Sequence, residues 1–194
     1  MVTVYHGINQ EELKLDFNMK IGFTGTVSVG KTTLVKALQE LPEFTEYNFA
    51  TERSKYLRDL GIPLNTDSTI KGQIIFLAER SSELLQPRII TDRTVIDVMA
   101  FTNLAKSIPH YVCDEFDQLS SRLISEYDYI FYISPDGIEL EDNEVRTIDP
   151  EYRMKVDKEI RKIISSNKNK IKKYIELSGT TEERIEKIKQ VMFS

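Results

Sequence analysis

A glycine-bounded loop near the start of the chain has the residue types that hold a phosphate group. The stretch KIGFTGTVSVGKTTLVKAL (20–38) satisfies the pattern G-x-x-x-x-G-K-[ST], with a short apolar run before it and a helical pattern after it. Glycine lets the backbone turn so that successive N–H groups point inward at phosphate oxygens, and the start of the helix adds its positive dipole end. We therefore expect a nucleotide's phosphates to be held by Gly25, Thr26, Val27, Ser28, Val29, Gly30, Lys31, Thr32 and Thr33.

Two side chains at the end of this loop have the chemistry to act on the phosphates directly. Lys31 can reach the β- and γ-phosphates as a compact point charge. Thr32 offers a hydroxyl to Mg²⁺, which bridges the same oxygens. The loop alone does not choose among a GTPase, an ATPase and a kinase. However, the chain has no N-K-x-D run for guanine recognition, and it is short for a motor ATPase.

Acidic and basic side chains also follow two of the predicted strands. Asp92 and Arg93 come directly after the apolar run RIITD, and Asp97 follows about one helical turn later. In a doubly wound sheet, ligands bind beyond the carboxyl ends of the strands, so Asp92 is placed to hold Mg²⁺ and Arg93 to hold a phosphate. Glu52 and Arg53 follow an earlier strand in the same way, with solvated helix caps and surface ion pairs as an equal alternative for these two.

The remaining sequence supplies the elements that would position these residues. Short apolar runs alternate with helical patterns of ten or more residues, which indicates right-handed βαβ crossovers and a parallel sheet covered on both faces. We therefore predict a three-layer α/β fold with five parallel strands and helices on both faces. The expected strands are 20–25, 45–50, 88–92, 127–134 and 173–178. The expected helices are 30–41, 51–61 (closed by Gly61), 67–86 (capped by Asp67 or Ser68), 94–106, 113–126, 150–167 and 180–193.

Composition limits the class of protein. The 194 residues suffice for one sizeable core, and the formal net charge of −5 argues against broad, sequence-independent nucleic-acid binding. Cys113 is the only cysteine, which excludes an intrachain disulfide and favours a reducing, cytoplasmic setting. No apolar run approaches the length of about 20 residues that spans a membrane, so no membrane association is expected.

The motifs TGTVSVGKTTL and TDRTVIDVMAF resemble the small P-loop nucleoside and nucleotide kinases. They are most similar to the ribosylnicotinamide kinase-like branch, often labelled AAA-type ATPase domains, and the chain also resembles deoxynucleoside and thymidylate kinases. In element order the likeness covers residues 20–194. It implies one P-loop NTPase domain over that range, preceded by an N-terminal extension, residues 1–19, that would serve as an edge strand, an oligomer arm or a substrate flap.

The resemblance also implies roles for the residues beyond the loop. Glu52 matches the general base that takes the proton from the acceptor hydroxyl, and Arg53 lies beside it in the acceptor site. Asp92 and Arg93 match the DR pair that serves magnesium and phosphate. This chain reads DRTVID where thymidylate kinases have Ser or Thr after DR-x-x, so the acceptor contacts stay open. The helices of residues 53–86 would border the acceptor pocket and offer it Tyr56, Arg58, Lys71, Gln73 and Phe76. Gln73 could read a base edge by paired hydrogen bonds and Phe76 could stack on it, and both are equally ordinary as helix-surface and core residues.

A polar segment at about 135–155 interrupts the regular pattern, with six acidic residues before Pro150. One interpretation is a solvated loop that leads into an amphipathic helix. The other is a lid over the triphosphate, in which Arg146, ahead of Arg153, stabilises charge on the transferred phosphoryl group. The predicted catalytic set is then Lys31, Glu52, Asp92, Arg93 and Arg146. Arg153 joins the nucleotide-binding residues, and Thr32 and Asp92 are the metal ligands.

Together these features predict an ATP- and Mg²⁺-dependent kinase that phosphorylates a hydroxyl of a nucleoside or nucleotide. A close alternative is a kinase acting on a hydroxyl of DNA or another polynucleotide, such as a hydroxymethylated base that must leave the stack to be reached. A different class is an ATPase or nucleotide-dependent switch that acts on a partner protein. A homodimer is left open.

Overall fold

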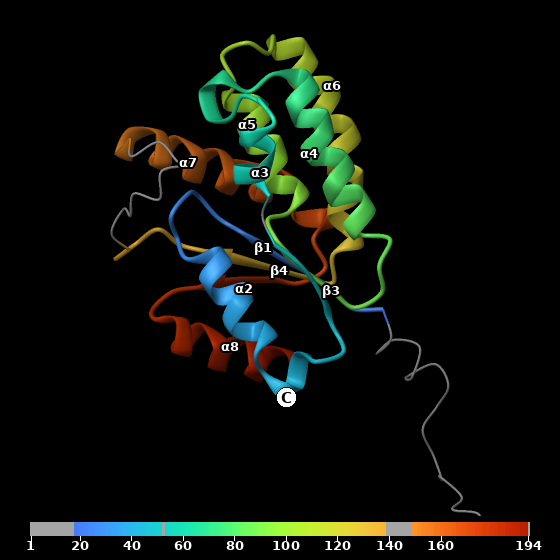
Figure 1. The fold of residues 1–194 in the computed structure, drawn as a ribbon, viewed down its shortest axis with the longest axis vertical. Helices are drawn as coiled ribbons and strands as arrows, with labels where there is room; N and C mark the ends of the chain where they lie inside the picture. Colours follow the sequence, from blue (N-terminus) through green and yellow to red (C-terminus); the bar gives the residue numbers. More distant parts are fainter. Residues whose placement is uncertain (1–17, 52, 139–148, 194) are drawn as a thin grey trace, which may run out of the picture.

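The computed structural model describes residues 18–51, 53–138 and 149–193, and these residues form a parallel sheet covered by helices on both faces (Figure 1). The strand order is β2-β3-β1-β4-β5, and every neighbouring pair of strands is parallel. This confirms the predicted five-stranded parallel sheet. The strands are β1 (Lys20–Thr24), β2 (Asn48–Ala50), β3 (Ile89–Asp92), β4 (Tyr129–Ile133) and β5 (Tyr174–Leu177).

The helices form the two outer layers. In Figure 1, α2 and α8 lie on one side of the sheet, and α4, α5, α6 and α7 lie on the other. The predicted three-layer α/β architecture is therefore confirmed. The helices are α2 (Lys31–Gln39), α3 (Ser54–Asp59), α4 (Ile70–Glu83), α5 (Val95–Leu104), α6 (His110–Ser120), α7 (Pro150–Ser166) and α8 (Thr181–Phe193).

The apolar central strands explain why both faces are covered. In β4, Tyr129, Phe131 and Ile133 belong to the core beneath α2 and α8. The alternate residues Ile130 and Tyr132 belong to the core beneath α4, α5 and α7. Because successive side chains of a strand point to opposite faces, a continuous apolar run requires a helix layer on each side.

The cap of α4 differs from the prediction. The side chain of Thr69 caps this helix by accepting a hydrogen bond from the backbone N–H of Gly72 at 3.3 Å. The predicted cap, Asp67 or Ser68, is wrong because the chain first makes a 3₁₀ turn (Asn65–Asp67) and only then enters the helix. Asp67, Ser68 and Thr69 are all residue types that cap helices, and the position of the 3₁₀ turn leaves Thr69 as the cap.

Two other helix ends can be compared with the sequence. Gly61 closes α3 as predicted, with a φ of 83° and its N–H donating to the carbonyl of Arg58 at 2.8 Å. The helix expected at 113–126 instead begins at His110, directly after a proline, and its last part (Ser121–Glu126) is a 3₁₀ helix. The N-terminal extension is almost wholly outside the described residues, so its role stays a prediction.

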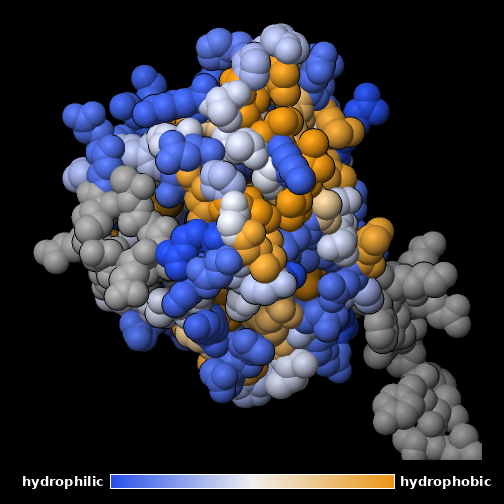
Figure 2. Space-filling view, turned by 45° about the horizontal axis from the view of Figure 1, so that its top comes forward, coloured by the Kyte–Doolittle hydropathy of each residue, from blue (hydrophilic) through white to orange (hydrophobic). Residues whose placement is uncertain are grey.

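Apolar side chains gather in a band on the molecular face shown in Figure 2, over the helical layer that comes forward in that view. The exposed large apolar residues of α3, α4 and α6, and of the residue that directly follows α3, are Tyr56, Ile74, Tyr111, Leu119 and Leu60. No helix within the described ranges is long and apolar enough to cross a lipid bilayer.

Candidate active site

The predicted phosphate loop connects β1 to α2 and turns sharply at both of its glycines. Gly25 has a φ of 146° and Gly30 a φ of 80°. A Cβ atom on Gly25 would lie 2.6 Å from the carbonyl oxygen of Ile133 in β4, a distance that side chains do not tolerate. The loop is therefore pressed against the neighbouring strand, and glycine at this position is required by packing as well as by backbone conformation.

Lys31, the first residue of α2, folds back over this loop. Its Nζ donates hydrogen bonds to the carbonyl oxygens of Gly25 and Thr26, both at 2.6 Å, and the residue is 3% exposed. The ammonium group is thus held at the mouth of the turn formed by the loop. A phosphate entering that turn would meet this charge at short range, where burial strengthens the attraction.

Thr32 and Asp92 are brought together from distant parts of the sequence. The Thr32 hydroxyl donates to Asp92 Oδ2 at 2.5 Å, and Asp92 is fully buried at the end of β3. The second carboxylate oxygen, Oδ1, is also buried and has no hydrogen-bond partner in the described part of the chain. Hydroxyl and carboxylate oxygens are hard ligands suited to Mg²⁺, and an orphaned buried carboxylate oxygen fits a metal ion or its bound water.

The described residues contain no cluster of three or more His, Cys, Asp or Glu side chains that could hold a metal ion by itself. Mg²⁺ at this place would therefore take few ligands from the protein. Such sites are typical of enzymes in which phosphate oxygens and water complete the octahedral shell. Thr32 and Asp92 fit that kind of site.

Arg93 follows the same strand in a backbone conformation that is uncommon for a side-chain-bearing residue. Its φ is 101°, and its amide donates to the carbonyl of Phe23 in β1 at 3.0 Å. The guanidinium lies 3.4 Å from Asp97 Oδ1 and 5.0 Å above the ring of Phe101. A left-handed, non-glycine residue persists only where its surroundings hold it, and such residues cluster at functional sites.

Asp97 fixes both the start of α5 and the neighbouring arginine. Its Oδ2 accepts from the backbone N–H of Thr94 at 2.8 Å and from the Thr94 hydroxyl at 3.1 Å. The Thr94 hydroxyl in turn accepts from the N–H of Ile96 at 3.1 Å, which completes a capping box. The fully buried Asp97 therefore leaves one oxygen to orient Arg93, so the DR pair and the following aspartate form one connected unit.

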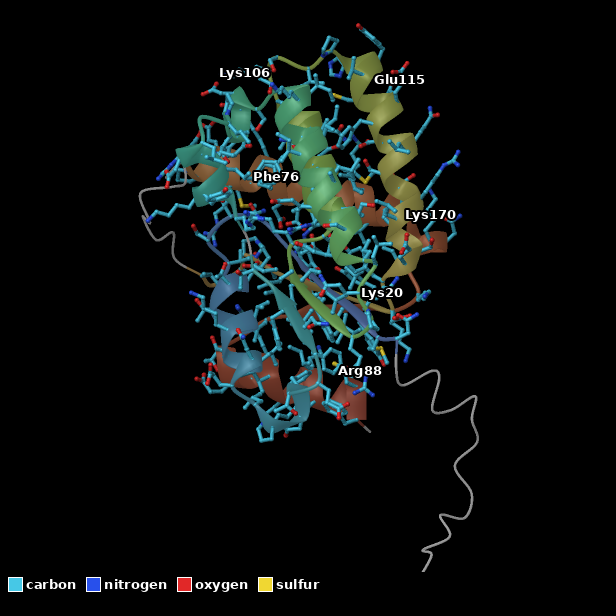
Figure 3. All side chains as sticks on the ribbon, turned by 45° about the vertical axis from the view of Figure 1, so that its right-hand side comes forward. Lys20, Phe76, Arg88, Lys106, Glu115 and Lys170 are labelled. Carbon is cyan, nitrogen blue, oxygen red and sulfur yellow. The ribbon has the colours of Figure 1, made fainter. Side chains whose placement is uncertain are left out.

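A pocket adjoins the phosphate loop on the side of α4 and α5. It encloses about 490 Å³ of empty space when the open solvent at its mouth is included. Figure 3 shows Phe76 on the side of α4 toward the loop end of the sheet. The pocket is lined by Val27, Ser54, Leu64, Asn65, Ser68, Gln73, Phe76, Arg93, Asp97, Val98 and Phe101.

The lining contains two of the five acceptor residues suggested by the sequence, Gln73 and Phe76. Gln73 is only 2% exposed, so its amide is a buried polar group that requires partners. The other three, Tyr56, Arg58 and Lys71, are not among the lining residues. Their positions in the sequence were equally consistent with the pocket, but α3 and α4 turn them elsewhere.

The residues expected beside β2 are only partly described. Glu52, the predicted general base, lies outside the described residues. Arg53 forms a salt bridge of 3.3 Å with Glu79 of α4 and lies over the ring of Tyr56 at 4.6 Å. Arg53 thus ties α3 to α4, and its role toward an acceptor stays a prediction.

The two arginines predicted for a lid have different outcomes. Arg146 lies outside the described residues, so the lid itself stays a prediction. Arg153, near the start of α7, directs its guanidinium at backbone oxygens and donates to Ile138 at 2.8 Å and to Ser28 at 3.4 Å. Its own carbonyl accepts from the Thr26 hydroxyl at 2.7 Å. Arg153 therefore contacts the phosphate loop through the loop's backbone.

Sequence reasoning missed a second buried arginine at the loop. Arg184 lies in the first turns of α8, is 4% exposed, and donates from Nη1 to the carbonyl of Val29 at 3.0 Å. The available signal was its spacing from Ile188, because residues four apart share a helix face and Ile188 is fully buried. In the run TTEERIEKI, however, this arginine looks like one more surface charge.

Arg80 was missed for the same reason. It is buried in α4, where it donates to Glu83 at 2.5 Å and more weakly to the backbone carbonyl of Asp92 at 3.4 Å. Burial raises the pKa of Glu83 to about 7, although the positive charge of Arg80 opposes that shift. The hydrogen bond from Arg80 to the Asp92 carbonyl connects α4 to the end of β3.

Comparison with known proteins shows which family and which folds this chain resembles. The chain matches the profile of an AAA domain family, AAA_28, over residues 20–184. No curated protein sequence matches it significantly.

Three solved structures illustrate the similarity of fold. The first is the NadR protein in complex with NAD and AMP-PNP, with a TM-score of 0.67 and 16% identity over 90% of this chain; the match spans 49% of NadR, so the chain is about half its length. The second is a deoxyadenosine kinase from M. mycoides with bound dCTP, with a TM-score of 0.60 and 19% identity over 90% of this chain and 98% of the kinase. The third is a thymidylate kinase from Candida albicans, with a TM-score of 0.60 and 15% identity over 91% of each chain.

Proposed function

The chain belongs to the AAA domain family and has the fold of the P-loop nucleoside and nucleotide kinases, and from that premise we propose that it transfers the γ-phosphoryl group of ATP to a hydroxyl of a nucleoside or nucleotide. The observation that carries the proposal is the wall shared by the phosphate loop and the pocket. Val27 of the loop and Arg93 of the DR pair both line the pocket. An acceptor bound there would lie next to the phosphates held by the loop, as transfer between them requires.

The loop residues would bind the phosphoryl donor, ATP. Lys31 would neutralise charge on the β- and γ-phosphates from its buried position. Thr32 and Asp92 would hold Mg²⁺, which supplies charge neutralisation and fixes the phosphate geometry when bound. In the proposed transfer, the acceptor oxygen forms a bond to the γ-phosphorus, the bond to the β–γ bridging oxygen breaks, and ADP leaves.

The acceptor side depends on Arg93 and on two predicted residues. Arg93 would orient the acceptor hydroxyl or an attached phosphate, because Asp97 and Phe101 hold its guanidinium at the pocket wall. Glu52 is proposed as the base that takes the proton of the attacking hydroxyl, and Arg146 as a cation that stabilises the transferred group. Both assignments rest on the family resemblance.

The pocket lining supports a planar, aromatic acceptor with a hydrogen-bonding edge. Phe76 and Phe101 offer ring faces for stacking, and the buried amide of Gln73 offers a donor and an acceptor. A free nucleoside or nucleotide has these features. A flipped base of a polynucleotide shares them, so that acceptor is an outcome to be tested.

The test is ADP release from Mg-ATP with pooled acceptors. The pools are nucleosides, nucleoside monophosphates, nicotinamide riboside, and plain and hydroxymethyl-modified DNA. We expect one small-molecule pool to raise turnover well above the rate without acceptor in the wild type and in Lys36→Ala, an exposed lysine on the same helix, but not in Lys31→Ala. Stimulation by modified DNA alone would favour the polynucleotide alternative. Equal turnover with and without every pool would contradict a kinase and favour the switch.

A further inference from the structure

Four peptide groups of the phosphate loop have their carbonyl oxygens held by cationic side chains. Lys31 binds the carbonyls of Gly25 and Thr26. Arg153 of α7 donates to the carbonyl of Ser28, and Arg184 of α8 donates to the carbonyl of Val29. A trans peptide is planar, with its C=O and N–H pointing in opposite directions. Each cation that holds a carbonyl therefore turns the N–H of the following residue to the other side.

Arg184 has few polar partners for its buried charge among the described residues. Among the described residues its side chain makes a single hydrogen bond, to Val29, and no salt bridge. Its Nε is buried and has no hydrogen-bond partner within those residues. Burial lowers the pKa of this guanidinium, and no carboxylate in the described part of the chain opposes the shift. A buried charge without a counterion is costly, and within the described residues Arg184 has no counterion.

The position of Arg184 in its helix adds to this cost. It lies in the first turns of α8, at the positive end of the helix dipole, where acidic residues are favoured and cations are not. The start of α2 is next to it: a Cβ atom built on Gly30, the residue preceding α2, would be 3.3 Å from Arg184 Nη1. Two positive helix ends and a buried guanidinium thus meet at the loop. Such an arrangement is stabilised by a bound polyanion.

From this geometry we infer that Arg184 is a positioning residue of the nucleotide site, which turns the Gly30 N–H toward the phosphates by holding the Val29 carbonyl and whose buried charge is compensated by the bound polyphosphate. The inference rests on the proposed function to the extent that the loop must bind a nucleoside triphosphate. It goes beyond that function by assigning part of the phosphate affinity to α8, an element outside the loop and the DR pair. The acceptor pocket does not include Arg184.

The experiment compares Arg184→Met, which keeps the apolar length of the side chain, with Arg184→Lys, which keeps its charge. The control is Lys187→Met, which removes an exposed positive charge from the same helix. Melting temperatures are measured without ligand and with Mg-ATP, and dissociation constants are measured for ATP, tripolyphosphate and adenosine by calorimetry. Lys31→Ala is included to report on the loop itself.

We expect Arg184→Met to melt at the wild-type temperature or above without ligand, because an uncompensated buried charge is removed. Its affinity for ATP and tripolyphosphate should fall roughly 10- to 100-fold, the range for a hydrogen bond that involves a charged group. Affinity for adenosine should not change, Arg184→Lys should be intermediate, and Lys187→Met should match the wild type.

Two results would overturn the inference. If Arg184→Met melts well below the wild type and yet keeps its affinity for ATP and tripolyphosphate, the arginine only supports the fold. If adenosine binding weakens as much as ATP binding, the arginine does not act on the phosphates. Loss of ATP affinity in Lys31→Ala with full affinity in Arg184→Met would defeat this inference and leave the proposed function intact. A wild-type protein that binds no ATP would defeat both.

Discussion

Replacing Gly25 by alanine tests whether the phosphate loop is held in shape by contact with β4. The added Cβ would lie 2.6 Å from the carbonyl oxygen of Ile133. Carbon–oxygen contacts between neighbouring strands normally lie at about 3.3 Å or more, so loop and strand must separate by roughly 0.7 Å. Both atoms belong to, or are fixed by, the backbone, and no side-chain rotation relieves the clash.

Two costs add in this variant. An alanine at a φ of 146° occupies a region that non-glycine residues rarely adopt, at about 1–3 kcal/mol. Forcing the loop away from a packed strand costs about 1–3 kcal/mol more. At about 2–4 °C per kcal/mol for a protein of this size, the melting temperature should fall by roughly 10 °C. ATP affinity should fall about tenfold or more, because the displaced N–H groups lose their alignment with the phosphates.

Gly61→Ala is the matched control. Gly61 also has a positive φ, 83°, but a Cβ atom there would meet nothing within 4 Å. This variant isolates the conformational cost, about 1 kcal/mol, and should lower the melting temperature by about 2–4 °C with unchanged ATP affinity. Differential scanning fluorimetry and calorimetric ATP titration measure both quantities. Equal melting losses in the two alanine variants, with wild-type ATP affinity in Gly25→Ala, would refute the reasoning.

Three further predictions concern the rest of the site. Asp92→Asn keeps an acceptor for the Thr32 hydroxyl but removes the charge that would hold Mg²⁺. We expect kcat to fall about 10²–10³-fold, and Mg²⁺ should no longer tighten ATP binding. Unchanged Mg²⁺ dependence would contradict the metal assignment. Gln73→Leu should raise the acceptor KM about tenfold without changing ATP affinity, while Lys71→Leu on the exposed side of the same helix changes neither; equal effects would place the acceptor elsewhere. Burial raises the pKa of Glu83 to about 7, so the stabilising contribution of this group is complete below about pH 4.5 and is lost as the pH rises through 7. Urea unfolding should therefore show a smaller loss of stability between pH 5 and pH 8 in Glu83→Gln than in the wild type. Identical losses in the two proteins would contradict that pKa.

The fold could be predicted because the local sequence pattern of each strand and helix indicates its type. Apolar runs such as YIFYI in β4 and the helical spacing of the segments between them determine a parallel three-layer sheet without knowledge of any contact. The phosphate loop could be predicted for a similar reason, since its glycines, lysine and threonine are neighbours in sequence. The exact start of α4 and the exact end of α6 were harder to predict, because a short 3₁₀ helix adjoins each of these two helix ends.

The parts of the site that could not be predicted depend on contacts between distant segments. The clash that requires Gly25 comes from Ile133, and the arginine that holds the Val29 carbonyl comes from α8. Apart from the spacing of Arg184 from Ile188, nothing local separates Arg184 or Arg80 from the exposed arginines and lysines around them. Likewise, Gln73 and Lys71 are two residues apart on α4, and only the packing of α5 against that helix decides which of them lines the pocket.

The most direct test of the central claim is a single-turnover reaction with ATP labelled in its γ-phosphate, in which the destination of the label is identified. The account predicts that, with the stimulating acceptor pool present, the label appears in a phosphorylated nucleoside or nucleotide, and that Lys31→Ala abolishes this product. Label found only as inorganic phosphate, at a rate that no acceptor changes, would contradict phosphoryl transfer and identify the protein as an ATPase.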